Sequence, residues 1–314
     1  MTRRGAVFFA ALCVVWGIPY LLIKVAVSEV SPVSLVFLRT GIAAVLLLPV
    51  ALAQGKLRPV LAKWRPMLVY TVVEIATPWL LLSDAERHLT SSLAGLLVAA
   101  VPLVGAGLAL LRPDGDRLGR VGLLGLAVGL AGVAALVGLD VHGSQALAVV
   151  EVAGVVLGYA IGPIIMAGAL RDLPVLGVVA VSLAACAVGY APFGVPGLPG
   201  EWPRPSVLAS IALLAVVCTA VAFLLMFGLV AEVGPVRATV ITYVNPAVAV
   251  AAGVLLLGEP LTVAVVVGFV LVILGSLLAT RRGRPRGPAE PLPAGAPAGA
   301  ARVGAEPVRH GRPG

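Results

Sequence analysis

The sequence predicts an all-α integral membrane protein with ten transmembrane helices, arranged as two five-helix repeats of inverted orientation. Three observations lead to this prediction: the composition, ten long apolar segments, and motifs shared by the two halves of the chain. Of the 314 residues, 60% are hydrophobic and 11% are charged, whereas an average soluble chain carries about 25% charged residues. Such a composition excludes a soluble enzyme, a nucleic-acid-binding module and a disordered protein.

Each predicted helix is an apolar segment of about 20 residues, the length needed to cross a hydrocarbon core about 30 Å thick. Backbone groups inside lipid must be hydrogen-bonded within their own segment, so these segments are expected to be helices. The first segment follows Arg3 and Arg4 as in a signal peptide, but it lacks a convincing cleavage site, so we interpret it as a retained span. In chain order, the expected spans are residues 6–27, 33–53, 66–83, 89–111, 118–139, 146–169, 174–193, 206–230, 235–257 and 261–280.

The distribution of basic residues predicts the orientation. Most of the 22 Lys and Arg residues fall on one side if the N-terminus is cytoplasmic, and the positive-inside rule then places both termini in the cytoplasm of an inner-membrane protein. The net charge of +8 is concentrated in the Pro- and Gly-rich tail at 281–314, which we expect to be a disordered cytoplasmic segment. The charge therefore does not indicate a nucleic-acid partner.

The three cysteines and the glycine pattern indicate packing. Cys13, Cys186 and Cys218 all lie in apolar segments, so we interpret them as small hydrophobic residues, and neither a metal site nor a cofactor is expected. The glycines of the fifth segment recur at helical spacing and predict a small-residue packing seam between helices. They are Gly122, Gly125, Gly129 and Gly132.

Two halves of the chain share motifs at a nearly constant offset. Residues 94–102 match 238–246, with a proline at the end of each. Residues 14–17 likewise match 155–158, and Pro32 matches Pro174. Because each half holds an odd number of spans, the second half must enter the membrane from the opposite face, as in many secondary transporters. We expect a first repeat at 1–140 and a second at 141–280.

These motifs resemble those of the drug/metabolite transporter superfamily, in particular its EamA-like ten-helix members. The resemblance covers about residues 6–280 and rests on the order and spacing of several short motifs. They are Trp16-Gly17 with Pro19 and Lys24, Pro32 with residues 37–39, residues 92–97 with Pro102, residues 234–246, and residues 257–262. The loop at 112–118 departs from the Gly-Glu-Pro-Leu-Thr pattern of residues 258–262, so we expect the two halves to be functionally unequal. The resemblance implies transport of small metabolites, commonly outward, without ATP.

Glu74 is the leading candidate for proton coupling, because an ionisable residue at membrane depth is functional by default. Thr71 and Thr77 flank it at helical spacing and predict a polar stripe. The carboxyl group would carry a proton or pair with a cationic substrate. The alternative is a structural hydrogen bond, or a static ion pair with Arg39 or Lys24.

Arg39 and the first helix supply the candidate cations and aromatic rings. Arg39 would act as an anion clamp or as a counter-ion for Glu74; the alternatives are a structural ion pair and an orientation toward the headgroups. Trp16, Tyr20 and Lys24 are spaced four residues apart and predict one stripe, which would line a substrate cavity. The alternative for Tyr20 and Lys24 is an interfacial anchor.

Prolines within two corresponding helices mark the expected substrate site, because interrupted helices at matching positions are typical of transporter sites. Pro102 and Pro246 hold these positions, and the alternative is a bend that serves packing alone. Further candidate substrate-binding residues share this region or add aromatic surface. They are Thr242, Tyr243, Asn245, Trp79 and Tyr159.

The residues therefore favour a secondary transporter that moves a small organic metabolite or drug by alternating access, and the resemblance implies that it is an exporter. An importer of a metabolite or of a nucleotide-sugar-like solute is the alternative. An intramembrane lipid-modifying enzyme is less favoured, because Glu74 has no second acid at catalytic spacing, and a channel is less favoured because the halves are unequal. The expected partners are a small-molecule substrate, the lipid bilayer and, in a homodimer, a second copy.

Overall fold

The structure, a computed structural model, describes residues 2–111, 119–138, 144–234, 238 and 240–280. Within these residues the regular secondary structure is helical, and eight helical stretches are long and apolar enough to cross a membrane. Two further apolar helices, Ile241–Leu257 and Val263–Ala279, are shorter. The prediction of an all-α membrane protein with about ten spanning helices is confirmed. The expected tail at 281–314 and the divergent loop at 112–118 lie outside the described residues.

We number the ten spans in chain order; four of them consist of more than one helix. Span 1 comprises α1 (Arg3–Val15) and α2 (Pro19–Ala26), and span 2 is α3 (Pro32–Ala53), followed by the short α4 (Arg58–Ala62). Span 3 comprises α5 (Trp64–Tyr70), the π-helical η1 (Thr71–Ala76) and α6 (Thr77–His88). Span 4 comprises α7 (Ser91–Val98) and α8 (Val101–Leu110), and span 5 is α9 (Arg120–Val137).

The second half repeats much of this division. Spans 6 and 7 are α10 (Ser144–Ala167) and α11 (Val175–Gly194). Span 8 comprises α12 (Pro205–Ala212), the π-helical η2 (Leu213–Val221) and α13 (Ala222–Val233). Spans 9 and 10 are α15 (Ile241–Leu257) and α16 (Val263–Ala279). The third span of each half thus contains a π-helical segment, and such segments frequently occur at functional sites.

Span 3 is longer than the sequence predicted. It continues from the expected end at residue 83 to His88, and this last turn carries Glu86 into the protein interior. The prediction of the helix end was wrong because residues 84–88 are polar and charged, so an apolar segment cannot reveal that they remain helical. Lys24 stabilises the end of this helix through hydrogen bonds to its carbonyl oxygens.

Span 1 is interrupted between α1 and α2. Pro19 begins α2 and lacks the N–H that would continue the helical hydrogen bonding, and Gly17 donates its N–H to Val14 O rather than to Cys13 O. Gly17 also faces span 9 so closely that a Cβ atom would overlap Val248. Only glycine therefore fits at this crossing of spans 1 and 9.

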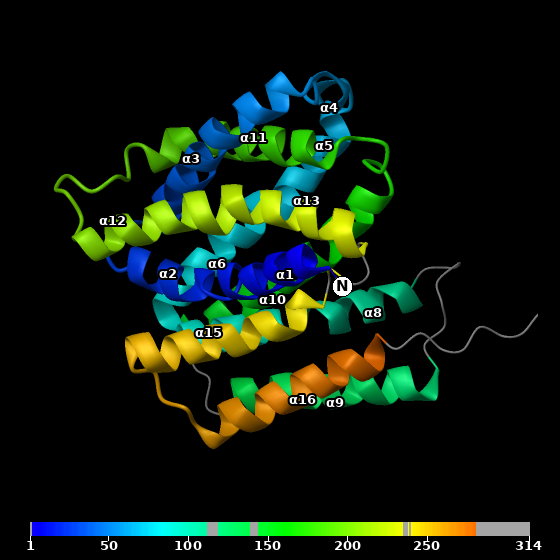
Figure 1. Ribbon diagram of the computed structural model, residues 1–314. Coiled ribbons are helices and arrows are strands. Elements are labelled where there is room, and N and C mark those ends of the chain that lie inside the picture. The colour runs from blue at the N-terminus through cyan, green and yellow to red at the C-terminus, as the bar shows by residue number, and fades with distance from the viewer. Residues whose placement is uncertain (1, 112–118, 139–143, 235–237, 239, 281–314) are drawn as a thin grey trace, which may run out of the picture. The chain divides into compact units, whose positions relative to one another are not determined.

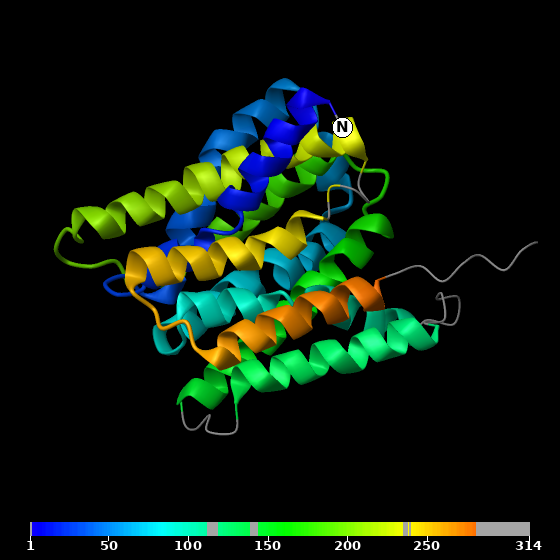
Figure 2. The ribbon, with the colours of Figure 1, turned by 60° about the horizontal axis from the view of Figure 1, so that its bottom comes forward.

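The helices pack in pairs that join the two halves. Spans 1 and 8, 2 and 7, 3 and 6, 4 and 9, and 5 and 10 are each in contact. Figures 1 and 2 both show the pair α9 and α16 side by side. In that pair, a Cβ atom on Gly275 would overlap the backbone of Gly129, and one on Gly132 would overlap Val272 N. The predicted small-residue seam on span 5 is confirmed, and span 10 is its partner.

Side-chain contacts tie the connections together at each end of the helices. The connections at 27–31, 89–90, 195–204 and 258–262 lie at one end, which we call the Glu259 end; Figure 1 shows the last two at the left. The connections at 54–63 and 168–174 lie at the other end, which we call the Lys63 end.

The three cysteines are free and buried within the apolar core, as their sequence positions predicted.

Candidate functional site

Arg39 lies inside the helix bundle. Its side chain extends from α3, its Nε donates a hydrogen bond to Thr219 Oγ1 in η2 at 3.0 Å, and its Cζ lies 3.7 Å from the centre of the Trp79 ring. Arg39 and Trp79 are each 7% exposed. A guanidinium stacked on indole forms a cation–π interaction, worth about 2 kcal/mol when desolvated. The alternative in which Arg39 extends to the lipid headgroups is therefore wrong.

Two tyrosines complete the surroundings of this cation. Tyr20 of α2 and Tyr159 of α10 both lie within electrostatic reach of Arg39, and each keeps part of its surface accessible. We call Arg39, Tyr20, Trp79, Tyr159 and Thr219 the Arg39 cluster. Its members come from spans 1, 2, 3, 6 and 8, so they meet only when the two halves pack together.

The Arg39 guanidinium retains hydrogen-bonding capacity. Among the described residues its Nε alone donates to a protein group, and no carboxylate lies within ion-pair distance. The two terminal nitrogens form the edge of the guanidinium that binds a carboxylate or phosphate in bidentate fashion. These nitrogens are available for the anion that the sequence leads us to expect, and that role stays a prediction; the ion pair with Glu74 is not formed among the described residues.

Glu74 occupies the π-helical segment of span 3 and packs against span 6. Its carboxylate approaches Gly162 so closely that a Cβ atom on this glycine would overlap Oε2. Oε2 is buried and has no hydrogen-bond partner among the described residues. Glu74 also lies within electrostatic reach of Tyr159, which places it next to the Arg39 cluster. A carboxyl group held without a partner can bind a proton or a cation.

The polar stripe predicted around Glu74 is not present. Thr71 is buried and donates its hydroxyl to Met67 O at 2.9 Å, whereas Thr77 is exposed. The spacing argument assumed a regular α-helix, but residues 71–76 are π-helical, with i→i+5 bonding that rotates the following residues about the axis.

The stripe predicted on span 1 is divided by the interruption after Val15. Trp16 packs edge-to-face on Phe223 of span 8, with ring centres 6.1 Å apart, whereas Tyr20 belongs to the Arg39 cluster. Lys24 Nζ donates to Glu86 O at 2.6 Å and to Leu89 O at 2.8 Å. Glu86 lies in the last turn of α6 and Leu89 is its C-cap residue, so Lys24 stabilises the end of this helix instead of extending to the headgroups.

The candidates on spans 4 and 9 have structural contacts. Span 4 is interrupted at residues 99–100, just before Pro102 in the first turn of α8, but α15 continues through Pro246, so only one of the two expected interruptions is present. The side-chain amide nitrogen of Asn245, oriented toward these two carbonyl groups, donates hydrogen bonds to Cys13 O at 3.2 Å and to Ile241 O at 3.0 Å. Cys13 O is the carbonyl oxygen that the break in span 1 leaves without its helical partner. Tyr243 Oη lies 2.9 Å from Thr280 Oγ1, and Thr242 is exposed, so neither joins the Arg39 cluster.

Three polar residues that matter here were missed in the sequence. Glu86 is fully buried, Thr219 binds Arg39, and Glu259 accepts hydrogen bonds from Ser91 N and Ser92 N at 2.7 and 2.9 Å and from Ser92 Oγ at 2.5 Å. Burial alone would raise the pKa of Glu259, but these hydrogen bonds outweigh it and hold the pKa below its ordinary value. The capping serines 168 and 167 residues away gave no sequence signal for this contact.

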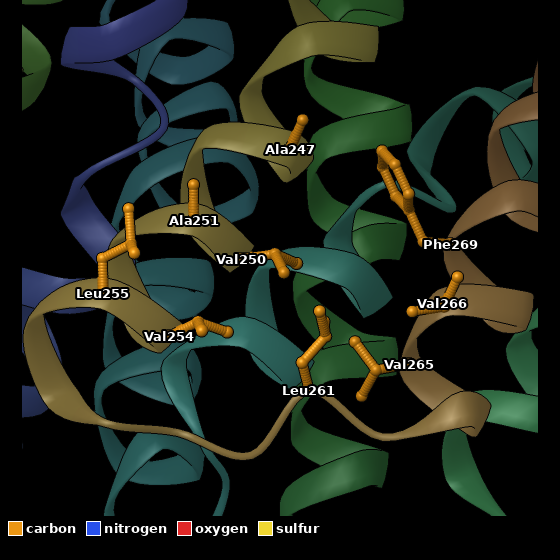
Figure 3. A pocket seen from close by; sticks show the side chains of 9 residues that line it. All are labelled: Ala247, Val250, Ala251, Val254, Leu255, Leu261, Val265, Val266 and Phe269. Atoms are coloured by element: carbon orange, nitrogen blue, oxygen red, sulfur yellow. The ribbon is translucent and has the colours of Figure 1, made fainter.

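A groove of about 350 Å³ lies between α15 and α16 (Figure 3), and none of these polar residues lines it. Its lining is apolar throughout, including Val250, Val254 and Phe269, so it holds no group that could orient a polar solute. Among the described residues, no group of three or more His, Cys, Asp or Glu side chains could hold a metal ion. The Arg39 cluster, with Glu74 beside it, is therefore the candidate site.

Two curated relatives are named as transporters, and one solved structure has the same fold. The chain is 29% identical over 287 residues to the uncharacterized inner membrane transporter YedA of Escherichia coli, covering 87% of this chain and 91% of the relative. It is 24% identical over 288 residues to the uncharacterized transporter YvbV of Bacillus subtilis, covering 90% and 93%. A crystal structure of a protein 20% identical has the same fold, with a TM-score of 0.63 over 89% of this chain and 97% of that one. The model of the EamA-like transporter family matches twice, at residues 3–138 and 146–281, and this multi-pass membrane protein belongs to that family.

Proposed function

We propose that the protein is a secondary transporter that exports a small organic solute by alternating access of two inverted five-helix halves, 1–140 and 141–280. The observation that carries this proposal is the Arg39 cluster, an aromatic-lined cation with free hydrogen-bonding capacity at the junction of both halves. A buried, incompletely paired cation is costly inside a membrane protein, so its presence at the junction of the two halves favours a ligand-binding role.

The helix pairs support the inverted relation between the halves. If each span of the first half is equivalent to the span five places later, the contacts 2–7, 4–9 and 5–10 each map onto themselves. The contact 1–8 then maps onto 6–3, which is also observed. This is the pattern expected around a pseudo-two-fold axis that relates two inverted repeats.

Two ion pairs at opposite ends support the same relation. At the Glu259 end, Glu29 pairs with Arg204; at the Lys63 end, Asp172 lies 3.9 Å from Lys63. Asp172 follows Glu29 by 143 residues and Arg204 follows Lys63 by 141, close to the offsets of the sequence motifs. The backbone N–H and the guanidinium of Arg204 hold the pKa of Glu29 below its ordinary value, so this carboxylate stays ionised at neutral pH.

We assign the solute to the Arg39 cluster. The terminal nitrogens of Arg39 would bind an anionic group of the solute, and Tyr20, Trp79 and Tyr159 would contact its organic part. Glu74 would bind the coupled proton or a cationic group of the solute. Rocking of the halves would then open this site alternately at the Glu259 end and the Lys63 end.

The orientation and direction complete the proposal. We place the Lys63 end in the cytoplasm of a bacterial-type inner membrane, together with both termini, because the basic residues gather there. Export is proposed from the resemblance to drug/metabolite transporters, and the polar contacts described above are compatible with either direction. A homodimer is the proposed oligomer.

Metabolite profiling of the growth medium tests this function. It compares cells that express the intact protein, Arg39→Gln, Glu74→Gln or the exposed-loop control Glu201→Gln at equal membrane levels, together with cells that lack the protein. We expect at least one organic anion to accumulate outside with the intact protein and the Glu201 control, and to stay at background with Arg39→Gln.

Each other outcome changes a defined part of the proposal. Accumulation with Arg39→Gln equal to that of the intact protein removes the solute from the Arg39 cluster. Accumulation with Glu74→Gln keeps the solute site and removes Glu74 from coupling. Depletion of a compound from the medium by the intact protein alone replaces export with import.

A further inference from the structure

Glu86 is the most completely buried carboxyl group in the described part of the chain. It lies in the last turn of α6 with 0% of its surface exposed, and neither Oε1 nor Oε2 has a hydrogen-bond partner. An ionised carboxylate without partners is costly to bury, whereas the protonated group is neutral. Burial without partners therefore favours the protonated form of Glu86 over the ionised form.

Charged groups from three other elements surround Glu86. Lys24 of α2 donates to the backbone oxygen of Glu86 itself, and Arg39 of α3 and Glu259 of the 258–262 connection lie within electrostatic reach. Tyr20 of α2 is also within this reach. Glu151 of α10, which packs on the same helix, has Asp84 and Arg87 as its charged neighbours instead.

The contacts next to Glu86 close the Glu259 end. Lys24 holds the terminal carbonyls of α6, and Glu259 holds the first N–H groups of α7, so spans 1, 3, 4 and the 9–10 connection are joined around one carboxyl group. Gly253 leaves room for this arrangement, because a Cβ atom there would overlap Glu259 Oε2 and Ser92 Oγ.

We propose that Glu86 is a proton-binding site that controls opening of the Glu259 end. When Glu86 gives its proton to water, the new carboxylate attracts the Lys24 ammonium away from the carbonyl oxygens of residues 86 and 89. The same negative charge repels the Glu259 carboxylate from the start of α7. Both effects weaken the closed arrangement, so proton release favours opening and proton binding favours closure.

This inference deepens the proposed function, because it names the proton as coupling ion and assigns it to a group other than Glu74. The proton would bind when the Glu259 end faces an acidic compartment, close that end, and leave after the halves have moved. Glu74 remains free to interact with the solute in the Arg39 cluster.

A buried cysteine reports the opening without any solute. Ser91 is fully buried beneath Glu259 and contacts it through its backbone N–H, which Ser91→Cys retains. The purified full chain in lipid nanodiscs is treated with a polar maleimide between about pH 5.5 and 8.5, a range across which a carboxyl group with the ordinary or a lowered pKa stays ionised. The native cysteines are all buried, so the chain without Ser91→Cys supplies the blank.

The measured quantity is the labelling rate of Ser91→Cys divided by that of Ser91→Cys/Glu86→Gln at the same pH. The ratio removes the intrinsic pH dependence of the thiol. Linkage to one proton allows the ratio to rise by as much as about tenfold per pH unit, and we expect a rise of about tenfold over the whole range. Glu86→Asp retains a titratable group and is expected to retain the rise, and His88→Gln tests the exposed imidazole of the same turn.

A ratio that stays constant with pH overturns the proposal, as does a rise that His88→Gln abolishes. If Glu86→Gln does not fold, the labelling rates of Ser91→Cys and Ser91→Cys/Glu86→Asp are compared instead. A rise in labelling that the carboxyl group at position 86 controls must occur at a different pH in these two proteins. The two proposals can fail separately. A pH-dependent labelling ratio without any solute export supports the proton site and contradicts the proposed function. Solute export that is independent of pH and of Glu86 supports the proposed function and contradicts the proton site.

Discussion

At the residue scale, the interior of the protein tolerates Arg39 because two different interactions satisfy different parts of its guanidinium. Trp79 covers one face, and Thr219 accepts the hydrogen bond of Nε. The planar guanidinium is suited to this arrangement, whereas the compact ammonium of lysine is not.

Arg39→Lys is therefore expected to reduce solute export about tenfold or more at equal membrane abundance, although the charge is retained, because stacking and Nε hydrogen bonding are lost. Trp79→Phe keeps an aromatic face and is expected to have a smaller effect. Trp64→Phe is the control, since Trp64 is 52% exposed. Efflux from loaded cells measures the rates of the three variants and of the intact protein; equal rates for Arg39→Lys and the intact protein would contradict the assigned role.

Glu259 gives a pH-dependent contribution to stability. Its pKa is lower in the folded protein than in the unfolded chain, so its stabilising effect is complete above the ordinary carboxyl range and is lost as the pH falls through the lowered value. Glu259→Gln is expected to cost about 1–2 kcal/mol at pH 7, since three hydrogen bonds to a charged acceptor are weakened. Thermal unfolding of both proteins from neutral to acidic pH measures this difference, which must shrink with acidification; a difference independent of pH would contradict it.

At the element scale, close approach between spans depends on missing side chains. Gly275 of α16 lies against the backbone of Gly129 in α9, and a Cβ atom has no space there. Alanine usually stabilises an exposed helix by about 0.5–1 kcal/mol relative to glycine. At the contact between α9 and α16, alanine in place of glycine is instead expected to destabilise the protein, because its Cβ atom would force the two helices apart.

Gly275→Ala is thus expected to destabilise the protein by about 1–3 kcal/mol through overpacking. Gly105→Ala in α8 is the matched control, because a Cβ atom there meets no atom within 4 Å, and it is expected to be neutral or stabilising. Thermal unfolding in detergent compares the two. Equal effects of both substitutions would show that the seam does not determine the α9–α16 contact.

At the scale of the whole molecule, the two ion pairs at opposite ends are expected to favour opposite conformations. The pair at the Glu259 end is closely formed, whereas the Lys63–Asp172 distance is 3.9 Å with both side chains exposed. This difference suits a state that is closed at the Glu259 end. Exposed ion pairs have small energies, so each pair should bias the equilibrium rather than determine it.

Arg204→Glu is expected to increase the labelling of Ser91→Cys several-fold, because like charges at Glu29 and residue 204 separate the 27–31 and 195–204 connections. Lys63→Glu, which acts at the other end, is expected to leave the labelling unchanged or to lower it. The double change Glu29→Arg with Arg204→Glu restores opposite charges and should restore the low rate. Equal labelling of all four proteins would show that these pairs do not influence the equilibrium.

The sequence by itself determined the class of protein, the number and order of the spans, and the small-residue seam of span 5. These features are local: an apolar segment of sufficient length must become a helix in lipid, whatever its neighbours are. The sequence also identified Arg39, Trp79 and Glu74, since an ionisable or aromatic side chain at membrane depth is conspicuous in a chain with few polar residues.

Only the tertiary structure decided what these residues contact. Arg39 reaches Thr219 across 180 residues of sequence, Lys24 reaches the carbonyl of Glu86 across 62, and Glu259 reaches Ser91 across 168. Hydropathy describes one segment at a time, so it could not show that Glu86 is buried by other spans or that a π-helical segment turns Thr77 away from Thr71. Each of these contacts depends on the packing of helices that are distant in the chain, either within one half, as for Lys24 and Glu86, or between the halves, as for Arg39 and Thr219.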